Sequence, residues 1–274
     1  MDAITVGTLN ICGLRPRPPL WTLEQRAPEL CRRLEESSID VLNLQEVCHA
    51  SSLRLLRTGL RSYPYEAYRR GVAGPAGGLV TFSRLPLGHP SYRSFLGTYP
   101  RQGGARFRLR RAAMGAIQGI LTVPLLTEAV TIVNTHLTAN SDDDYSAGGR
   151  FHDFQRAQLV RLNALLARRP RPGLRVITGD FNLASTSDLY PLVVAYGAHR
   201  DPFATTDPYT YHPAFLRDGV PPLRVDYLLV DGDEHHYPVL GAETFFENPV
   251  TGEDGATLYL SDHVGLTVQI GLSP

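Results

Sequence analysis

The sequence predicts an α+β fold in which two β-sheets pack face to face and helices cover their outer faces. Strand-like stretches outnumber helical ones along the 274 residues. The two kinds do not alternate strictly, which argues against a fully parallel, doubly wound sheet. No internal repeat or low-complexity linker divides the chain, so we expect a single domain over residues 1–274.

Helices are indicated where apolar residues recur at helical spacing. In the first such stretch Leu23, Ala27, Leu30 and Leu34 would share one face. A second stretch opens with serines that can cap a helix and then repeats leucine. The predicted helices cover residues 22–38, 51–62, 151–169 and, as a short helix, 185–197.

Strands are indicated by short, β-rich runs bounded by glycine, proline or polar turns. The last run alternates apolar residues from Leu258 to Ile270, apart from a break at Ser261-Asp262-His263. We interpret this break as polar residues in the middle of a half-buried strand. The predicted strands cover residues 3–11, 40–47, 63–70, 78–84, 92–100, 105–112, 115–125, 129–137, 172–183, 223–232, 237–246 and 257–270.

The amino-acid composition argues against several classes of function. The formal net charge is +0 and the pI is about 7.1, which argues mildly against a general nucleic-acid binder. The chain contains no lysine, so all 27 basic residues are arginine. Schiff-base chemistry through lysine and a lysine-containing phosphate loop are therefore both excluded.

The cysteines and the N-terminus bear on the compartment. Cys12, Cys31 and Cys48 show no metal-binding spacing, and we expect reduced thiols. Residues 1–10 lack the pattern of a secretory signal, and no apolar stretch is long enough to span a bilayer. We therefore expect a cytoplasmic protein, and a monomer by default.

Polar side chains stand at the ends of several predicted strands. One such residue alone is usually a turn or cap residue. Residues of the types Asn, Asp, Glu and His at so many strand ends are more simply explained by one shared site. The candidates are Asn10, Glu46, His136, Asp180, Asn182, Asp226, Asp262 and His263.

The chemistry of these candidates converges on phosphoryl transfer to water. Carboxylates and amides are hard oxygen ligands that suit Mg²⁺ or Mn²⁺ better than zinc. Histidines can donate to a phosphoryl oxygen or exchange a proton near neutral pH. No GxSxG nucleophile signature occurs. The set predicts metal-assisted attack of water on phosphorus.

The ordered stretches TLNICGL, LNLQEV, VNTHLTA, TGDFN, RVDYLLV and LSDHVGL resemble the endonuclease/exonuclease/phosphatase superfamily, whose fold is deoxyribonuclease I-like. The resemblance runs from residue 5 to residue 268 and implies a four-layer αββα sandwich. Within the superfamily the chain looks most similar to the neutral sphingomyelinases, chiefly through GGLVTFSRLPL, YTYHPAFLRDGVPPLRVDYLLV and TFFENPVTGEDGATLYLSDH.

The resemblance implies a role for each candidate. Glu46 would bind the principal metal ion with help from the amide of Asn10, and Asp262 would face the metal and hold a second ion. The catalytic residues would be five. His263 would be the general base, Asp226 would fix its tautomer, Asp180 would lie near the attacking water, Asn182 would contact phosphate or metal, and His136 would stabilise the phosphoryl oxygens.

The sequence departs from the family where a Lys-Gly pair usually opens a strand. We place Met114-Gly115 at this point, with Arg110 or Arg111 as a substitute cation. The helix after NTHL usually carries an Arg and a Gln three residues apart, and here Gln155 stands in place of the arginine before Gln158.

Substrate selection is open at this point. The favoured reading is a Mg²⁺- or Mn²⁺-dependent phosphodiesterase of the phospholipase C type acting on sphingomyelin or a related lipid, with transient membrane contact. Contact would come from Tyr92, Phe95, Tyr99, Phe245 and Phe246, although such aromatics more often pack sheet edges.

Charged segments also bear on the substrate. Arg106, Arg108 and Arg110 would share one face of a strand that could meet lipid phosphates or a nucleic acid, or simply protect a sheet edge. The acidic loop 140–149 weighs against a polyanion. The alternatives are a nuclease or a nucleotide or inositol phosphatase on the same site, and a binding module without activity.

Overall fold

The structure of the protein is a computed structural model that describes residues 1–14, 20–100, 103–140, 144–168, 173–251, 255 and 257–272. Its strands form two large sheets and one small ribbon. The first sheet has the order β10 (Val239–Phe245), β13 (Gly265–Gly271), β1 (Ala3–Asn10), β2 (Val41–Gln45), β4 (Val80–Ser83), β3 (Tyr65–Ala67). The second has the order β5 (Ser91–Ser94), β6 (Gly119–Pro124), β7 (Val130–His136), β8 (Leu174–Asp180), β9 (Asp226–Asp231).

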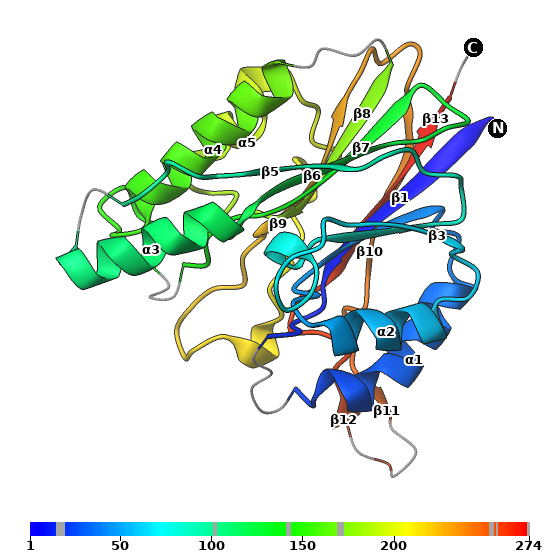
Figure 1. Cartoon of the computed structure of the whole chain (residues 1–274), viewed down its shortest axis with the longest axis horizontal. Coiled ribbons are helices and arrows are strands. Elements are labelled where there is room, and N and C mark those ends of the chain that lie inside the picture. Colours follow the sequence, from blue (N-terminus) through cyan, green and yellow to red (C-terminus); the bar gives the residue numbers. More distant parts are fainter. Residues whose placement is uncertain are drawn as a thin grey trace.

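The helices lie outside the two sheets, as Figure 1 shows. One pair packs on the first sheet and the others lie on the far side of the second sheet, so the predicted four-layer αββα sandwich is confirmed. The helices are α1 (Leu23–Glu36), α2 (Ala50–Gly59), α3 (Ala105–Ile117), α4 (His152–Ala167) and the short α5 (Tyr190–Val193). Single 3₁₀ turns occupy Ala76–Gly78, Ala195–Gly197 and Pro213–Phe215.

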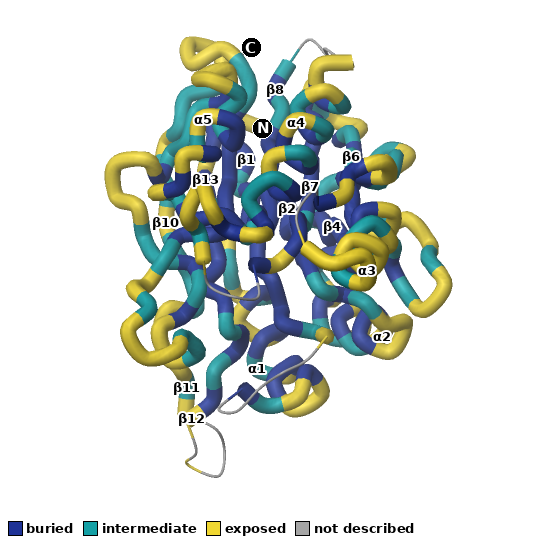
Figure 2. Tube along the Cα trace, turned by 90° about the vertical axis from the view of Figure 1, so that its left-hand side faces the viewer, coloured by how far each residue is buried: buried dark blue, intermediate teal, exposed yellow. Residues whose placement is uncertain are grey.

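The alternation along β1 shows how the layers are built. Ile4 and Val6 join the core between the two sheets, whereas Leu9 faces α1 and α2 on the other side. Side chains alternate between the faces of a strand, so one strand serves both cores. Figure 2 shows the result, with strands such as β1, β2 and β7 buried beneath a largely exposed outer shell.

Toward the end of the strands that bears the candidate site, the layer between the sheets becomes polar. Asn43 Nδ2 donates to Thr178 Oγ1 of the opposite sheet at 2.8 Å, and Gln45 Nε2 donates to Asn134 Oδ1 at 2.8 Å. Asn134 Nδ2 donates to the carbonyls of Leu44 and Val80, both at 3.1 Å. Buried polar groups are stable only when hydrogen-bonded, so this network fixes how the two sheets align beneath the site.

Two stretches have a different secondary structure from the predicted one, and a third strand, predicted from residue 115, begins only at Gly119. Residues 105–112 form part of helix α3 instead of a strand. Alternating arginines imitated a strand pattern, but Ala, Arg, Leu and Met all favour helix, and the segment lies outside both sheets. The break at Ser261-Asp262-His263 is a loop between two strands. Among the described strands β12 (Thr257–Leu258) pairs with β11 (Val250–Thr251) alone, and β13 begins at Gly265.

Among the described helices, none is long and apolar enough to cross a bilayer.

Candidate active site

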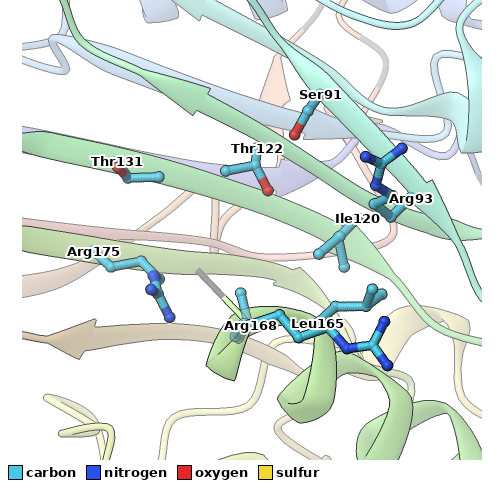
Figure 3. A pocket seen from close by; sticks show the side chains of 9 residues that line it. Ser91, Arg93, Ile120, Thr122, Thr131, Leu165, Arg168 and Arg175 are labelled. Atoms are coloured by element: carbon cyan, nitrogen blue, oxygen red, sulfur yellow. The ribbon is translucent and has the colours of Figure 1, made fainter. Parts of the chain in front are cut away.

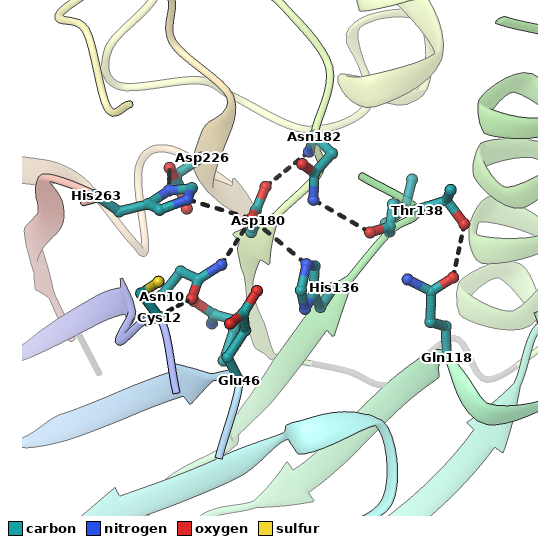
Figure 4. Close-up of polar contacts among 12 residues, drawn as sticks. Asn10, Cys12, Glu46, Gln118, His136, Thr138, Asp180, Asn182, Asp226 and His263 are labelled. Carbon is teal, nitrogen blue, oxygen red and sulfur yellow. Dashed lines mark hydrogen bonds and ion pairs between the residues drawn. The ribbon is translucent and has the colours of Figure 1, made fainter. Parts of the chain in front are cut away.

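The candidate residues meet because of how the strands run. β1 is parallel to β2, and β7 is parallel to β8, so four strands end at the same edge of the sandwich. β9 is antiparallel to β8, and β13 is antiparallel to β1, so these two strands begin at that edge. Figure 4 shows the outcome: side chains from both sheets converge on one place. They include Asn10, Glu46, His136, Asp180, Asn182, Asp226 and His263.

Asp180 lies at the centre of this group. Its Oδ2 accepts a hydrogen bond from Asn10 Nδ2 at 2.9 Å and lies 3.5 Å from His136 Nε2 and 3.8 Å from His263 Nε2. It is the last residue of β8 and is 1% exposed. Gly179 before it has φ +144, and a Cβ there would lie 1.9 Å from the Thr135 carbonyl oxygen. Glycine therefore lets β8 approach β7 closely enough to place Asp180 beside His136.

His263 and Asp226 form a buried pair. His263 Nδ1 lies 2.8 Å from Asp226 Oδ2, and the two side chains are almost fully buried. The ring of Tyr211 packs edge-on against the imidazole at 5.1 Å between centroids. A carboxylate on Nδ1 holds the ring so that Nε2 faces Asp180, which is the orientation that a general base needs.

The electrostatics of the pair favour a basic imidazole. Burial alone would lower the pKa of His263, but the charges of Asp226, Asp180 and Asp262 outweigh burial and hold that pKa well above its usual value. Burial raises the pKa of Asp226 to about 6, although the imidazole opposes the rise. His263 is therefore a stronger base than a histidine in water.

The other side of the site offers oxygen ligands. Glu46 follows β2 with a left-handed φ of +63, and its Oε2 accepts only the Leu14 N–H, at 3.2 Å, among the described residues. Asn10 Oδ1 accepts the Cys12 N–H at 2.9 Å and keeps a second lone pair. Burial first, and then the charges of Asp262 and Glu46, raise the pKa of the Cys12 thiol. This donor set fits a hard divalent cation.

Asn182 is held by the loop after β8. Its N–H donates to Asp180 Oδ1 at 2.8 Å, its Nδ2 donates to the Leu137 carbonyl at 3.2 Å, and its φ is +51. A left-handed backbone at a residue other than glycine is strained and concentrates at functional sites. The predicted contact of Asn182 with phosphate or metal stays a prediction.

Arg26 is a residue that the sequence reasoning missed. It lies on α1, is fully buried, and donates from Nη2 to the carbonyls of Ile11 at 3.0 Å and Cys12 at 3.1 Å. Its Nη1 also donates to the Leu260 carbonyl. One guanidinium thus ties the loop after Asn10 to the loop before Asp262. An arginine in an amphipathic helix gives no sequence signal for such a role.

The position that corresponds to the Lys-Gly pair of the family is not Met114-Gly115, as we predicted. Met114 and Gly115 belong to α3, and the glycine that opens β6 is Gly119, where a Cβ would lie 2.3 Å from the Arg93 carbonyl oxygen. Gln118 therefore stands before the strand glycine. Its Oε1 accepts from Thr138 Oγ1 at 2.7 Å, so the side chain is anchored to the loop that follows His136.

Gln155 and Gln158 hold the same region from α4. Gln155 Nε2 donates to the Asn182 carbonyl at 2.6 Å, and Gln158 Oε1 accepts the Thr138 N–H at 2.9 Å. Two glutamine amides thus fix the loops that carry Asn182 and His136. No arginine is needed at the first of these positions.

A separate cavity of about 210 Å³ lies between the second sheet and the C-terminal end of α4, as Figure 3 shows. Arg93, Arg168 and Arg175 line it, but Arg175 is also paired with Asp231 at 3.2 Å. None of the predicted site residues lines this cavity. The chemistry described above therefore belongs to the strand ends and not to this hollow.

A two-sheet sandwich with acids, amides and a histidine–aspartate pair at one end defines a hydrolase that acts on phosphoric ester bonds. Residues 7–263 match the model of the Endonuclease/Exonuclease/phosphatase family. The chain belongs to this family, whose enzymes depend on divalent metal ions. No curated protein matches the sequence.

Solved structures share the fold at low sequence identity. SmcL has a TM-score of 0.71 and 20% identity, with 98% of this chain and 99% of that chain covered. Sphingomyelinase C from Streptomyces griseocarneus has a TM-score of 0.69 and 21% identity, with both chains covered in full (100%). TDP2 of D. rerio in complex with single strand DNA product has a TM-score of 0.71 and 16% identity, with 98% of each chain covered.

Proposed function

We propose that the chain is a Mg²⁺- or Mn²⁺-dependent phospholipase C that hydrolyses sphingomyelin or a related lipid phosphodiester. The observation that carries the proposal is the buried His263–Asp226 pair, whose free imidazole nitrogen faces Asp180 beside a set of oxygen ligands. In such an arrangement the imidazole can remove a proton from a water molecule, and a cation on the oxygen ligands can neutralise the charge of the phosphodiester beside it.

The protein's own groups account for the proton and the charge. His263 Nε2 takes a proton from a water that Asp180 orients, and Asp226 stabilises the imidazolium that forms. The water oxygen bonds to phosphorus, the bond from phosphorus to the lipid oxygen breaks, and that oxygen acquires a proton from solvent. His136, 3.5 Å from Asp180, donates to a phosphoryl oxygen.

The metal would be held by Glu46, with Asn10 Oδ1 and Asp262 as further oxygen ligands. A divalent ion held there would supply positive charge to the phosphoryl oxygens. Arg26 is buried beneath the same loops, and its guanidinium donates to the backbone carbonyls of Ile11, Cys12 and Leu260.

The lipid assignment is supported by the long run of neutral-sphingomyelinase-like stretches and by the similarity to a sphingomyelinase C along the whole chain. A DNA end is the second candidate, because a TDP2 structure with bound single strand DNA product shares the fold equally well. Zero net charge weighs against a nucleic-acid substrate.

A parallel substrate panel tests the proposal. The protein with Mg²⁺ is incubated with sphingomyelin vesicles, phosphatidylcholine vesicles, plasmid DNA, single-stranded DNA, and nucleotide and inositol phosphates. We expect release of water-soluble phosphocholine from the sphingomyelin vesicles and no DNA nicking. Cleavage of DNA or of a phosphomonoester without lipid hydrolysis would reverse the assignment.

Glu46→Gln tests the metal site. The amide keeps the shape but loses the charge, so we expect half-maximal activity to need roughly 10–100-fold more Mg²⁺. Isothermal titration of Mg²⁺ into each protein measures the same affinity without turnover. Glu66→Gln, on the outer strand β3 and paired with Arg57, is the matched control. Unchanged Mg²⁺ affinity in Glu46→Gln would show that the ion binds elsewhere.

A further inference from the structure

Helix α3 is unusually exposed for a helix of a globular protein. Gly115 is its only buried residue, and Leu109 and Ile117 are 74% and 57% exposed. Figure 1 shows α3 projecting from the side of the molecule, and Figure 2 shows it as an exposed segment at the surface. Most surface helices bury an apolar stripe and expose charge, so exposed aliphatic side chains need an explanation.

The inner side of α3 is attached to the protein by few groups. Phe107 packs edge-on against Phe151 at 5.6 Å between centroids, and the guanidinium of Arg111 lies over both rings. Gly115 sits against Thr98, where a Cβ would lie 2.9 Å from Oγ1. These contacts settle which side of the helix faces inward.

The opposite side carries both charge and apolar surface. At helical spacing Arg106, Leu109, Arg110, Ala113 and Ile117 share one face. The sequence prediction that Arg106, Arg108 and Arg110 share a face is wrong, because it assumed a strand. Two arginines and two large aliphatic side chains therefore point away from the protein together. We call this set the α3 outer face.

The sequence that surrounds α3 is rich in arginine and contains no acid. No Asp or Glu occurs from residue 85 to residue 127, whereas arginine occurs at six positions in that segment. Within the described residues neither Arg106 nor Arg110 forms an ion pair. The segment is strongly cationic although the whole chain has zero formal net charge.

We propose that the α3 outer face docks the protein on an anionic lipid surface. A basic helix that also exposes aliphatic residues lies in the plane of a membrane interface, with the arginines on lipid phosphates and the apolar side chains among the upper acyl carbons. A nucleic acid would satisfy Arg106 and Arg110 but would leave Leu109 and Ile117 in water. The combination favours lipid over nucleic acid.

The position of α3 relative to the site supports docking. The helix ends at Ile117, and the next residue is Gln118, which is bonded to the loop after His136. In Figure 4 the amide nitrogen of Gln118 points toward His136. The C-terminal end of α3 therefore lies at the same edge of the second sheet as the strand ends that carry the site. The use of this docking, to bring lipid to the site, rests on the proposed function. Membrane binding itself does not require turnover.

Most of the predicted aromatic contacts do not compete for this role. Phe95 is fully buried in the core beneath the second sheet, and Phe245 and Phe246 pack on each other at 4.9 Å between centroids. Tyr99, 59% exposed in the loop before α3, is the one of the five that is largely open to solvent. The proposal does not depend on it.

Co-sedimentation with vesicles tests the proposal without measuring turnover. Vesicles of phosphatidylcholine alone and vesicles of phosphatidylcholine with phosphatidylserine are compared at low and high salt. We expect binding to the mixed vesicles that weakens with salt. Arg106→Gln/Arg110→Gln should weaken it roughly 30-fold, since each arginine near an anionic surface contributes about 1 kcal/mol. Leu109→Gln should weaken binding to the same vesicles even at high salt.

Matched controls are Arg54→Gln/Arg69→Gln and Leu126→Gln, which alter exposed residues away from α3. They should bind as the wild type does, and all variants should hydrolyse a soluble chromogenic phosphodiester at the wild-type rate. Wild type that fails to bind mixed vesicles, or α3 variants that bind them normally, would overturn the proposal. The proposal would also be overturned if the α3 variants lost binding to double-stranded DNA but kept their binding to vesicles. Docking through α3 without lipid hydrolysis would refute the proposed function alone.

Discussion

His263→Gln is expected to lower kcat by roughly 10²–10⁴-fold while leaving the fold intact. Among the described residues, His263 is the only histidine with one nitrogen facing Asp180 and the other bonded to a carboxylate, and the substitution removes it. General base catalysis contributes roughly 10²–10⁴-fold. Turnover of the best substrate in the panel, with Mg²⁺ saturating, gives the measurement.

The control for this prediction is His199→Gln. His199 is also buried, at 8% exposure. It lies beside Asp231, at the opposite end of β9 from Asp226 and the candidate site. It should keep wild-type turnover. In His263→Ala, added imidazole should restore part of the lost rate at saturating Mg²⁺ if the missing group is a base. Wild-type turnover in His263→Gln would show that another residue removes the proton.

The fold could be predicted where one pattern was sufficient. Buried strands such as β1 and β8 could be predicted because each is a short β-rich run bounded by turn residues. Helix α3 could not be read correctly, because Arg106, Arg108 and Arg110 alternate with Phe107 and Leu109 as they would in a strand. The absence of a neighbouring strand, which decided the outcome, is visible only in three dimensions.

The candidate site could be predicted from the residues that end strands, since chain direction brings such ends together. The residues that hold the site in place could not be predicted in this way. Arg26 and Gln155 act through backbone carbonyls, which any sequence provides. Gln118 was missed because one strand was started too early, at residue 115. Position relative to a strand end, more than residue type, carried the information.

Asp226→Asn is expected to change both the rate and its pH dependence. The asparagine cannot hold the imidazole in the same tautomer, so the plateau of kcat/KM should fall by roughly 10²–10⁴-fold. The negative charge that helps raise the pKa of His263 is also lost, so that pKa should fall. The neutral base then exists at lower pH, and the acidic limb of the pH profile should move toward lower pH. Asp231→Asn, at the other end of β9, should change neither quantity.

The same variant decides between two uses of this cluster. Ligand atoms of Asp180, Asp226 and His263 lie within 4.8 Å of one another, a spacing that could also hold a metal ion. We favour the catalytic pair because His263 Nδ1 and Asp226 Oδ2 already bond to each other at 2.8 Å, and an ion would have to separate them. If His263 and Asp226 act as a catalytic pair, Asp226→Asn should shift the acidic limb of the pH profile and leave the affinity for Mg²⁺ unchanged. A metal site predicts weaker Mg²⁺ binding with no shift of the limb at saturating Mg²⁺.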